Sequence, residues 1–254
     1  MSQDELEELI LSGKPVENVD LSDIDWTDMP DGALNARHCV FRETGLTDAE
    51  LAGAKFTDCT FERTRFAGAN LTDAIFSGCS FFDGETRVGC DFSRADLEGA
   101  TFENCNLSTS RFGLAGLFGA VFKNCKAAGA DFEDARFSKQ AGSRLAMSRV
   151  SFLSTRLDMA SFRGAKLDDC VFSECSLRQA DLRQVSFASA DLRNSDFSEA
   201  SFNGAFLDNA DCRGATLLGV DLTRLSSFEG LKVSSDQLTD LVRPLGIRVF
   251  PATR

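Results

Sequence analysis

At 254 residues the chain has the length of one long domain or of two ordinary ones, and it contains 23 Phe, no Tyr, one Trp, one His and four Pro. A core that accepts Phe and no Tyr leaves no place for a phenolic hydroxyl, which indicates a narrow, dry interior. The net charge of −12, from 39 acidic and 27 basic side chains, argues against direct binding to nucleic acid or to an anionic membrane, because both require a basic surface.

The first residues, SQDELEELILSG, predict a short helix within an N-terminal capping segment, residues 1–18. Ser2 and Glu5 have the spacing of a capping box. Leu6, Leu9 and Ile10 share one face, which we expect to cover the open first unit of the repeat that follows. The start is acidic where a secretory signal would be basic, and no apolar run has membrane-spanning length, so we expect a cytoplasmic protein.

Residues 19–230 carry a repeat of five. A large apolar residue, position i, recurs at every fifth place, as in Phe41, Leu46 and Leu51, and a small residue stands two places before it. A period of five fits neither an α-helix nor a plain strand. Repetition at a fixed period indicates a solenoid, in which each unit is stabilised by its neighbours.

The cysteine spacing indicates how many repeats form one coil. Cys39, Cys59 and Cys79 are twenty residues apart, as are Cys105 and Cys125. Four pentapeptides per coil would place each set in one column along the axis. With about 4.8 Å between stacked strands, about nine or ten coils give a rod on the order of 45 Å long.

Two excursions interrupt the repeat. In CSFFDGETRVGCDF the step from Phe81 to Phe92 is eleven residues and not ten, which indicates an excursion near residues 83–89. In SKQAGSRLAMSRVS the count of five is kept, but Gly142 and Met147 stand where large core residues are expected. This second stretch is either a degenerate coil or a loop near residues 138–149, and loops on rigid scaffolds commonly carry function.

The C-terminal segment, residues 231–254, leaves the repeat. Ser234 and Gln237 indicate a second capped helix through about Val242. A short apolar strand is expected to follow over Gly246–Pro251.

Residues that could carry chemistry give no catalytic or metal site. Eight of the nine cysteines stand at the small inward position and Cys212 at the large one, so all nine are expected to be reduced core residues. There is no CxxC pair, and nothing around the lone His38 forms a recognisable catalytic set. We therefore expect no enzyme, no cofactor and no metal.

The acidic residues allow two interpretations. Asp91, Asp131, Asp191 and Asp211 differ by multiples of twenty, so they would line one column if the second excursion preserves the phase of the coil. They belong either to an ordinary solvated surface or to a rod that imitates a polyanion. The charge density of such a rod would be lower than that of DNA. A net charge of −12 over about 45 Å is one charge per roughly 4 Å, whereas B-DNA carries one per roughly 1.7 Å.

Segments such as AGANLTDAIF, FSRADLEGATF and ASADLRNSDF resemble the A(D/N)LXX pattern of the pentapeptide-repeat family over about residues 20–222. That resemblance implies an all-β solenoid, a right-handed quadrilateral β-helix, here with short N- and C-terminal α-helices. Within the family, the layout of the two excursions and the tail LKVSSDQLTDLVRPLGIRVFP look like the Qnr quinolone-resistance proteins.

The Qnr likeness implies a non-catalytic, DNA-mimicking protein that binds a type II topoisomerase, DNA gyrase or topoisomerase IV, and protects it from quinolones. The extra residue of the first excursion would eject a loop, after which the coil resumes one step out of phase. The loop residues that this likeness assigns to partner binding are Asp83, Glu85, Thr86, Arg87, Lys139, Gln140, Arg144 and Met147.

The same likeness implies a homodimer joined tail to tail. Its interface would consist of Leu238, Leu241, Leu245, Ile247, Val249 and Phe250. The alternative function is that of a pentapeptide-repeat interaction scaffold that binds an unrelated protein.

Overall fold

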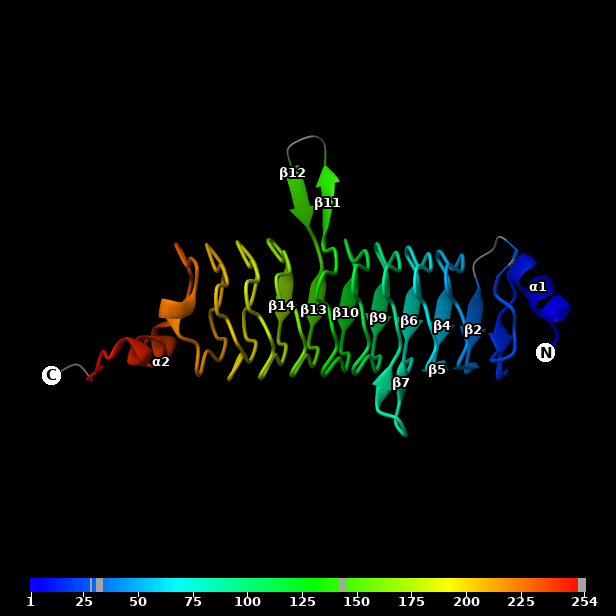
Figure 1. The fold of residues 1–254 in the computed structure, drawn as a ribbon, viewed down its shortest axis with the longest axis horizontal. Coiled ribbons are helices and arrows are strands. Elements are labelled where there is room, and N and C mark those ends of the chain that lie inside the picture. Colours follow the sequence, from blue (N-terminus) through cyan, green and yellow to red (C-terminus); the bar gives the residue numbers. More distant parts are fainter. Residues whose placement is uncertain (28, 31–33, 142–144, 251–254) are drawn as a thin grey trace.

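The computed structural model describes residues 1–27, 29–30, 34–141 and 145–250, without the side chains of residues 140, 141, 145 and 146. The described chain forms a rod with hairpins on two sides and a short helix at each end (Figure 1). It is the predicted all-β solenoid. Its main face is an eight-stranded parallel sheet of β1 (Val16–Glu17), β2 (Asn35–Arg37), β4 (Lys55–Thr57), β6 (Ile75–Ser77), β9 (Thr101–Glu103), β10 (Val121–Lys123), β13 (Ser151–Leu153) and β14 (Val171–Ser173).

Neighbouring strands of this sheet come from successive coils. β4 pairs with β6 in register, so that Phe56 lies beside Phe76, twenty residues further on. On the next face β3 (Val40–Arg42) pairs with β5 (Thr60–Glu62) at the same spacing. The prediction of four pentapeptides per coil is therefore confirmed. The ladder runs from β1 to the bridge between Asp211 and Lys232, slightly beyond the expected limits of residues 19–230.

The polar residues of the repeat make the corners. Corner residues such as Asp73 and Asn104 have φ of 55° and 56°, in the left-handed region that only Gly, Asn and Asp visit readily. At Gly78, with φ of 67°, a Cβ would come within 2.2 Å of the Asp58 carboxylate of the previous coil. The corner conformation therefore favours Gly, Asn and Asp, although other types such as Arg94, Leu114 and Glu199 also adopt it in this chain.

The interior is a stack of Phe rings and small residues. Phe92, Phe112 and Phe132 lie one above another with ring centroids 5.0 and 4.6 Å apart, and all three are fully buried. A ring enclosed in this way offers a phenolic hydroxyl no partner, which accounts for the absence of Tyr. All nine cysteines are buried and free, as predicted, and burial raises the pKa of the Cys90 thiol to about 12.

The first excursion is a hairpin of β7 (Phe82–Asp83) and β8 (Val88–Gly89). Across it the coil step is 26 residues, because Arg65 bridges to Asp91 and the Phe66 ring stacks on Phe92. The eleven-residue step is therefore one ordinary repeat plus six ejected residues. The coil resumes in phase, and the expectation of a one-step phase change is wrong.

The second excursion is a hairpin of β11 (Ser138–Ala141) and β12 (Leu145–Ser148), so it is a projecting loop and not a degenerate coil (Figure 1). Asp131 bridges to Ser161 and the Phe132 ring stacks on Phe162, a step of 30 residues. Ten residues, the length of half a coil, are ejected here.

The two hairpins leave the rod at diagonally opposite corners. One coil fills its four inward positions in the order Phe102, Leu107, Phe112, Leu117. The first hairpin leaves between the second and third of these positions, and the second hairpin leaves after the fourth, two coils further along. In Figure 1 they point to opposite sides of the rod. A flat partner surface cannot contact both.

Both ends are closed by helical segments. α1 (Gln3–Leu11) starts with the predicted capping box of Ser2 and Glu5, and it buries Leu6 and Ile10 against the first coil. At the other end lie the 3₁₀ turns η1 (Leu222–Arg224), η2 (Ser235–Gln237) and η3 (Arg243–Leu245), with α2 (Leu238–Val242) between the last two. The predicted capping box of Ser234 and Gln237 is present.

The expected strand after α2 is not found. Residues 247–250 form no strand, and Pro251 lies outside the described residues. A strand requires a neighbouring strand to pair with, and no strand of the described chain lies beside this tail.

Candidate functional site

The tip of the first hairpin is shaped by a buried carboxylate. Asp83 is 5% exposed and accepts hydrogen bonds from Glu85 N (2.9 Å), Thr86 Oγ1 (2.7 Å) and Arg63 Nη1 (3.1 Å). The bond from Thr86 holds the pKa of Asp83 below its usual value. Asp83 therefore positions the loop and is not free for a partner, contrary to expectation. Glu85, Thr86 and Arg87 are exposed at the tip of the hairpin.

The base of the same hairpin fits against the next coil without clearance. A Cβ on Gly89 would lie 2.4 Å from Ser110 N, 2.5 Å from Ser108 O and 2.6 Å from the carbonyl carbon of Thr109. The Thr109 hydroxyl also donates to Arg87 O at 3.3 Å. Only glycine can occupy position 89 in this packing.

The second hairpin is fixed to the rod by an ion pair. Lys139 Nζ contacts Glu98 Oε1 at 2.7 Å and Oε2 at 2.9 Å, and these hydrogen bonds raise the pKa of Lys139. A hollow of about 180 Å³ beside this pair is also lined by Phe118 and Arg136. Met147 is 49% exposed. The predictions for the Gln140 side chain and for Arg144 lie outside the described residues.

The predicted acidic column does not exist as one column. Asp91 and Asp131 share a column in which Arg111 stands between them, whereas Asp191 and Asp211 are direct neighbours in the column of β14. The half coil of residues ejected by the second hairpin moves every later residue to the opposite face. The phase on which the prediction depended is therefore not preserved.

Most of these carboxylates are already paired with arginine. Asp91 contacts Arg111 at 2.9 Å, and Asp191 and Asp211 contact the arginine two residues ahead at 2.6 Å. The hydrogen bonds from Arg193 and Arg213 lower the pKa of Asp191 and Asp211. No ion pair joins Asp131 to a basic side chain within the described ranges. Paired carboxylates give little net charge to a DNA-like surface.

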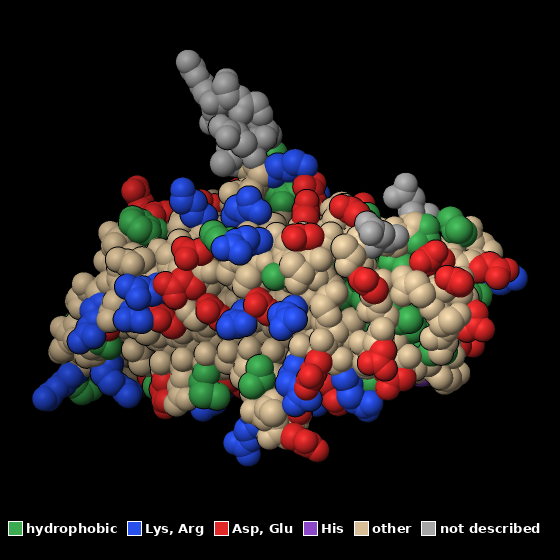
Figure 2. All heavy atoms as spheres, turned by 45° about the vertical axis from the view of Figure 1, so that its right-hand side comes forward, with side chains coloured by type: hydrophobic (Ala, Val, Ile, Leu, Met, Phe, Trp, Pro, Cys, Tyr) green, Lys and Arg blue, Asp and Glu red, His purple; other side chains and the backbone are tan. Residues whose placement is uncertain are grey.

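The net negative charge of the protein belongs to its N-terminal part. Residues 1–100 carry 21 acidic and 8 basic side chains, a net −13, whereas residues 101–254 carry 18 acidic and 19 basic ones. In Figure 2 the acidic side chains accordingly dominate the end of the rod that carries α1, while red and blue alternate elsewhere. A polyanion-like surface is therefore confined to α1 and the first four coils.

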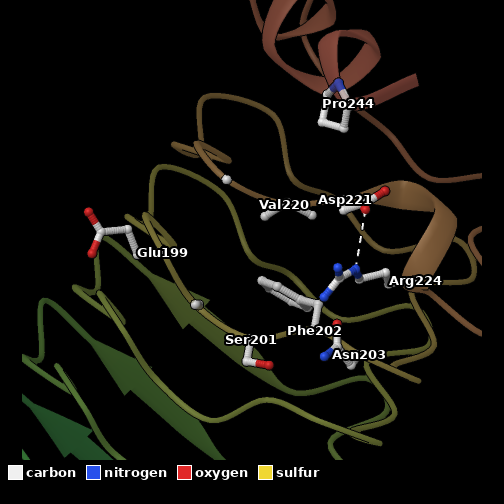
Figure 3. Close-up of a pocket in the computed structure, with 10 residues that line it drawn as sticks. Glu199, Ser201, Phe202, Asn203, Val220, Asp221, Arg224 and Pro244 are labelled. Atoms are coloured by element: carbon white, nitrogen blue, oxygen red, sulfur yellow. Dashed lines mark ion pairs between the residues drawn. The ribbon is translucent and has the colours of Figure 1, made fainter. Parts of the chain in front are cut away.

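A hollow of about 480 Å³ opens in the last coil and has no counterpart among the sequence predictions (Figure 3). It lies between residues 199–203 and 219–221, with Pro244 opposite. The coil that borders it has one extra residue, because Phe206 bridges to Ser227 after 21 residues. The six-residue step from Leu222 to Phe228 is the sequence signal. Two of its three charged lining residues, Asp221 and Arg224, pair with each other at 3.4 Å, and the third is Glu199.

The predicted dimer residues are mostly accessible. Leu238, Leu245, Ile247, Val249 and Phe250 are between 42% and 77% exposed, an unusual concentration of apolar surface. Leu241 is the exception, because it is 3% exposed and belongs to the core of its own chain. It is removed from the predicted interface.

Within the described residues, no three His, Cys, Asp or Glu side chains are placed as metal ligands. Neither helix of that part of the chain is long and apolar enough to cross a bilayer.

Comparison with known proteins identifies the family. The profile of the Pentapeptide repeats family matches residues 35–63, 46–81, 88–112, 115–139, 160–198 and 195–225, more than half of the chain. The chain belongs to the pentapeptide-repeat family. A comparison with curated protein sequences finds no match. The matches below are to repeat scaffolds, and no catalytic family is identified by them.

Among solved structures the chain is similar to QnrB1, described as a plasmid-mediated fluoroquinolone resistance protein. A trypsin-treated point variant of QnrB1 matches with a TM-score of 0.69 and 26% identity, over 93% of this chain and 98% of that chain. Full-length QnrB1 matches with a TM-score of 0.64 over 92% and 97%. HetL, a pentapeptide repeat protein from the cyanobacterium Nostoc, has 19% identity and a TM-score of 0.40, over 97% of this chain and 99% of that one. The chain is thus a Qnr-like pentapeptide-repeat protein.

Proposed function

We propose that this protein binds a type II topoisomerase, DNA gyrase or topoisomerase IV, and protects it from quinolones without catalysing a reaction. The likeness to QnrB1 over nearly the full length of both chains carries this proposal. The two hairpins support it, because each projects from the rod and has a side-chain contact with it near its base, from Arg63 to Asp83 in the first and from Lys139 to Glu98 in the second.

The parts of the rod have different tasks in this proposal. The acidic surface of residues 1–100 occupies the basic DNA-binding surface of the enzyme, since opposite potentials attract. The hairpins, at opposite corners, contact two separate walls of the groove in which the rod lies. The exposed Glu85, Thr86, Arg87 and Met147 are the contact residues.

We also propose that two copies join through the apolar tail. Four exposed apolar side chains after α2 would lose contact with water on pairing, and the tail would then find the strand partner that it lacks in the single chain. Sedimentation of the intact protein and of a Phe250→Asp variant tests this. Equal masses at the same concentration would contradict it.

Gyrase supercoiling and DNA cleavage in the presence of ciprofloxacin test the main proposal. Two deletions remove the hairpins without disturbing the coil. Loss of residues 83–88 leaves Phe82 and Gly89 at the corner and a five-residue step from Phe81 to Phe92. Loss of residues 139–148 likewise leaves a five-residue step from Phe137 to Phe152.

We expect the intact protein to restore supercoiling and either deletion to abolish the rescue. Inhibition of gyrase without rescue would support DNA mimicry and contradict protection from quinolones. An absence of any effect at micromolar concentrations on gyrase and topoisomerase IV would contradict the proposal and favour a scaffold for another protein.

A further inference from the structure

Two basic side chains lie side by side on the surface near the middle of the rod. Lys126 and Arg156 bridge to each other in successive coils, and stacked strands are about 4.8 Å apart. By contrast, Lys123 in the same coil faces Glu103, with which it forms an ion pair at 2.8 Å. Like charges placed directly opposite each other are destabilising. The Lys126–Arg156 pair therefore has an electrostatic cost that the packing of the coils does not explain.

The protein does not neutralise these two cations. Lys126 has no ion pair within the described part of the chain, and the one acidic contact of Arg156 there is Asp158, whose Oδ2 lies 3.8 Å from Arg156 Nε. The other oxygen of that carboxylate accepts hydrogen bonds from the Ser176 hydroxyl and from Arg178 N. Both cations are exposed, so their N–H donors are available to a ligand.

The pair borders a hollow of about 320 Å³, formed by the segments that directly follow β10, β13 and β14 (Figure 1). Asn124, Ser154 and Glu174 line it from equivalent corners of three successive coils, with φ of 54°, 47° and 57°. Glu174 Oε2 accepts a hydrogen bond from the Ser154 hydroxyl at 3.0 Å. The hollow thus has two cations and an amide at one end and a carboxylate at the other, and its volume is that of a small-molecule site.

We propose that this hollow binds a sugar phosphate, with the phosphate group between Lys126 and Arg156 and the sugar hydroxyls towards Glu174. The planar guanidinium group of arginine matches the geometry of a phosphate, and charge-assisted hydrogen bonds are the stronger ones. A carboxylate can only accept hydrogen bonds, so Glu174 fits hydroxyl groups, while the Asn124 amide can donate and accept. A bound dianion would also remove the repulsion between the two cations.

The same arrangement does not fit a polyanion such as nucleic acid. The column neighbours on either side of the pair are Asn106 and Ser176, both uncharged, so no line of cations continues along the rod. The carboxylate of Glu174, at the other end of the hollow, would repel a second phosphate group. A ligand with one phosphate and several uncharged hydroxyls matches both ends of the hollow.

Phosphorus NMR of ribose 5-phosphate and of inorganic phosphate, each titrated separately with the intact protein, tests the proposal. We expect both to bind, ribose 5-phosphate more tightly. A hydrogen bond to a charged group accounts for about ten- to hundredfold in affinity, so Lys126→Gln and Arg156→Gln should each weaken binding of both ligands by at least about tenfold. The matched control is Lys55→Gln, which removes the charge of another exposed lysine and should leave both affinities unchanged.

Two further measurements separate the parts of the site from the stability of the fold. Glu174→Ala should keep or strengthen binding of inorganic phosphate, because a negative charge is lost, and should reduce the preference for ribose 5-phosphate. Thermal unfolding without ligand should show Lys126→Gln melting at the temperature of the intact protein or about 1–2 °C higher, since repulsion is relieved. A loss of binding in this variant then reflects the site and not unfolding.

Equal affinities of the Lys126→Gln and Lys55→Gln variants for ribose 5-phosphate would overturn the proposal. So would an absence of binding of either ligand to the intact protein at roughly 10 mM. If inorganic phosphate binds as tightly as ribose 5-phosphate and Glu174→Ala changes neither affinity, the hollow recognises an anion alone and the assignment to a sugar phosphate is wrong.

Discussion

Replacing Gly89 by Ala tests how the first hairpin is seated. The new Cβ would lie within 2.6 Å of three backbone atoms of residues 108–110, and no side-chain rotation can relieve contacts with backbone. Overpacking of this kind costs typically 1–3 kcal/mol, and because all three neighbours are fixed we expect about 3 kcal/mol. At 1.4 kcal/mol per factor of ten, this raises the open population of the hairpin roughly 100-fold.

Native-state digestion with trypsin measures the open population, because Arg87 lies at the exposed tip of the hairpin and cleavage requires local opening. Mass spectrometry identifies cleavage after Arg87. Since β8 pairs with β7 and with no strand of a neighbouring coil among the described residues, we expect the strain to be relieved by opening of the hairpin, and the melting temperature of the rod should change little. If the coil itself were distorted, about 3 kcal/mol would lower it by roughly 6–12 °C.

Gly84→Ala is the matched control in the same hairpin. A Cβ at residue 84 meets no atom within 4 Å, so its effect should stay within about 0.5 kcal/mol. Equal cleavage rates and equal melting temperatures for the two alanine variants would refute the description of Gly89 as a residue that permits no side chain.

Three further predictions concern the tip of the first hairpin, the Asp–Arg ion pairs of the last coils and the Phe stack of the core. Asp83→Ala removes the acceptor for Glu85 N and the Thr86 hydroxyl, so cleavage after Arg87 should rise at least about tenfold, while Glu85→Ala should leave the rate unchanged. The lowered pKa values of Asp191 and Asp211 stabilise the fold above their unfolded value of about 3.9, and this contribution is lost as the pH falls through the folded values. Replacing Arg193 and Arg213 by Gln should therefore cost about 1 kcal/mol in urea unfolding at pH 7 and almost nothing near pH 2, and an equal loss at both would exclude the ion pairs as its cause. Phe122→Ala, between the Phe102 and Phe152 rings at 5.0 and 4.7 Å, should lower the free energy of unfolding by about 3–5 kcal/mol, and a loss below about 1 kcal/mol would contradict the stacked core.

The repeat could be predicted because its cause is local. Each inward residue, such as Phe112, is fixed by the chain's own period. The coil length is marked by five cysteines that fall into one column, Cys39, Cys59, Cys79, Cys105 and Cys125. The capping boxes at Ser2 and Ser234 depend on neighbours three residues away and were equally predictable.

The phase of the coil across each interruption could not be predicted in the same way. A fifteen-residue step from Phe137 to Phe152 is compatible with three repeats or with one repeat and a ten-residue hairpin, and the two differ by half a coil. Which face Asp191 occupies depends on this choice. Asp83 is buried and paired with Arg63, which lies twenty residues away, and the composition of the loop does not reveal such a pair.

The way in which the coils stack across the two hairpins also indicates how a rod of this kind could acquire a different binding partner. Phe76 stacks on Phe102, and Phe122 on Phe152, across the two hairpins, and none of the ejected residues takes part in these contacts. A segment of another length and composition could therefore be inserted at either corner while the coils before and after it keep their stacking. The solenoid would then serve as a mount for exchangeable recognition segments, in evolution as in the laboratory.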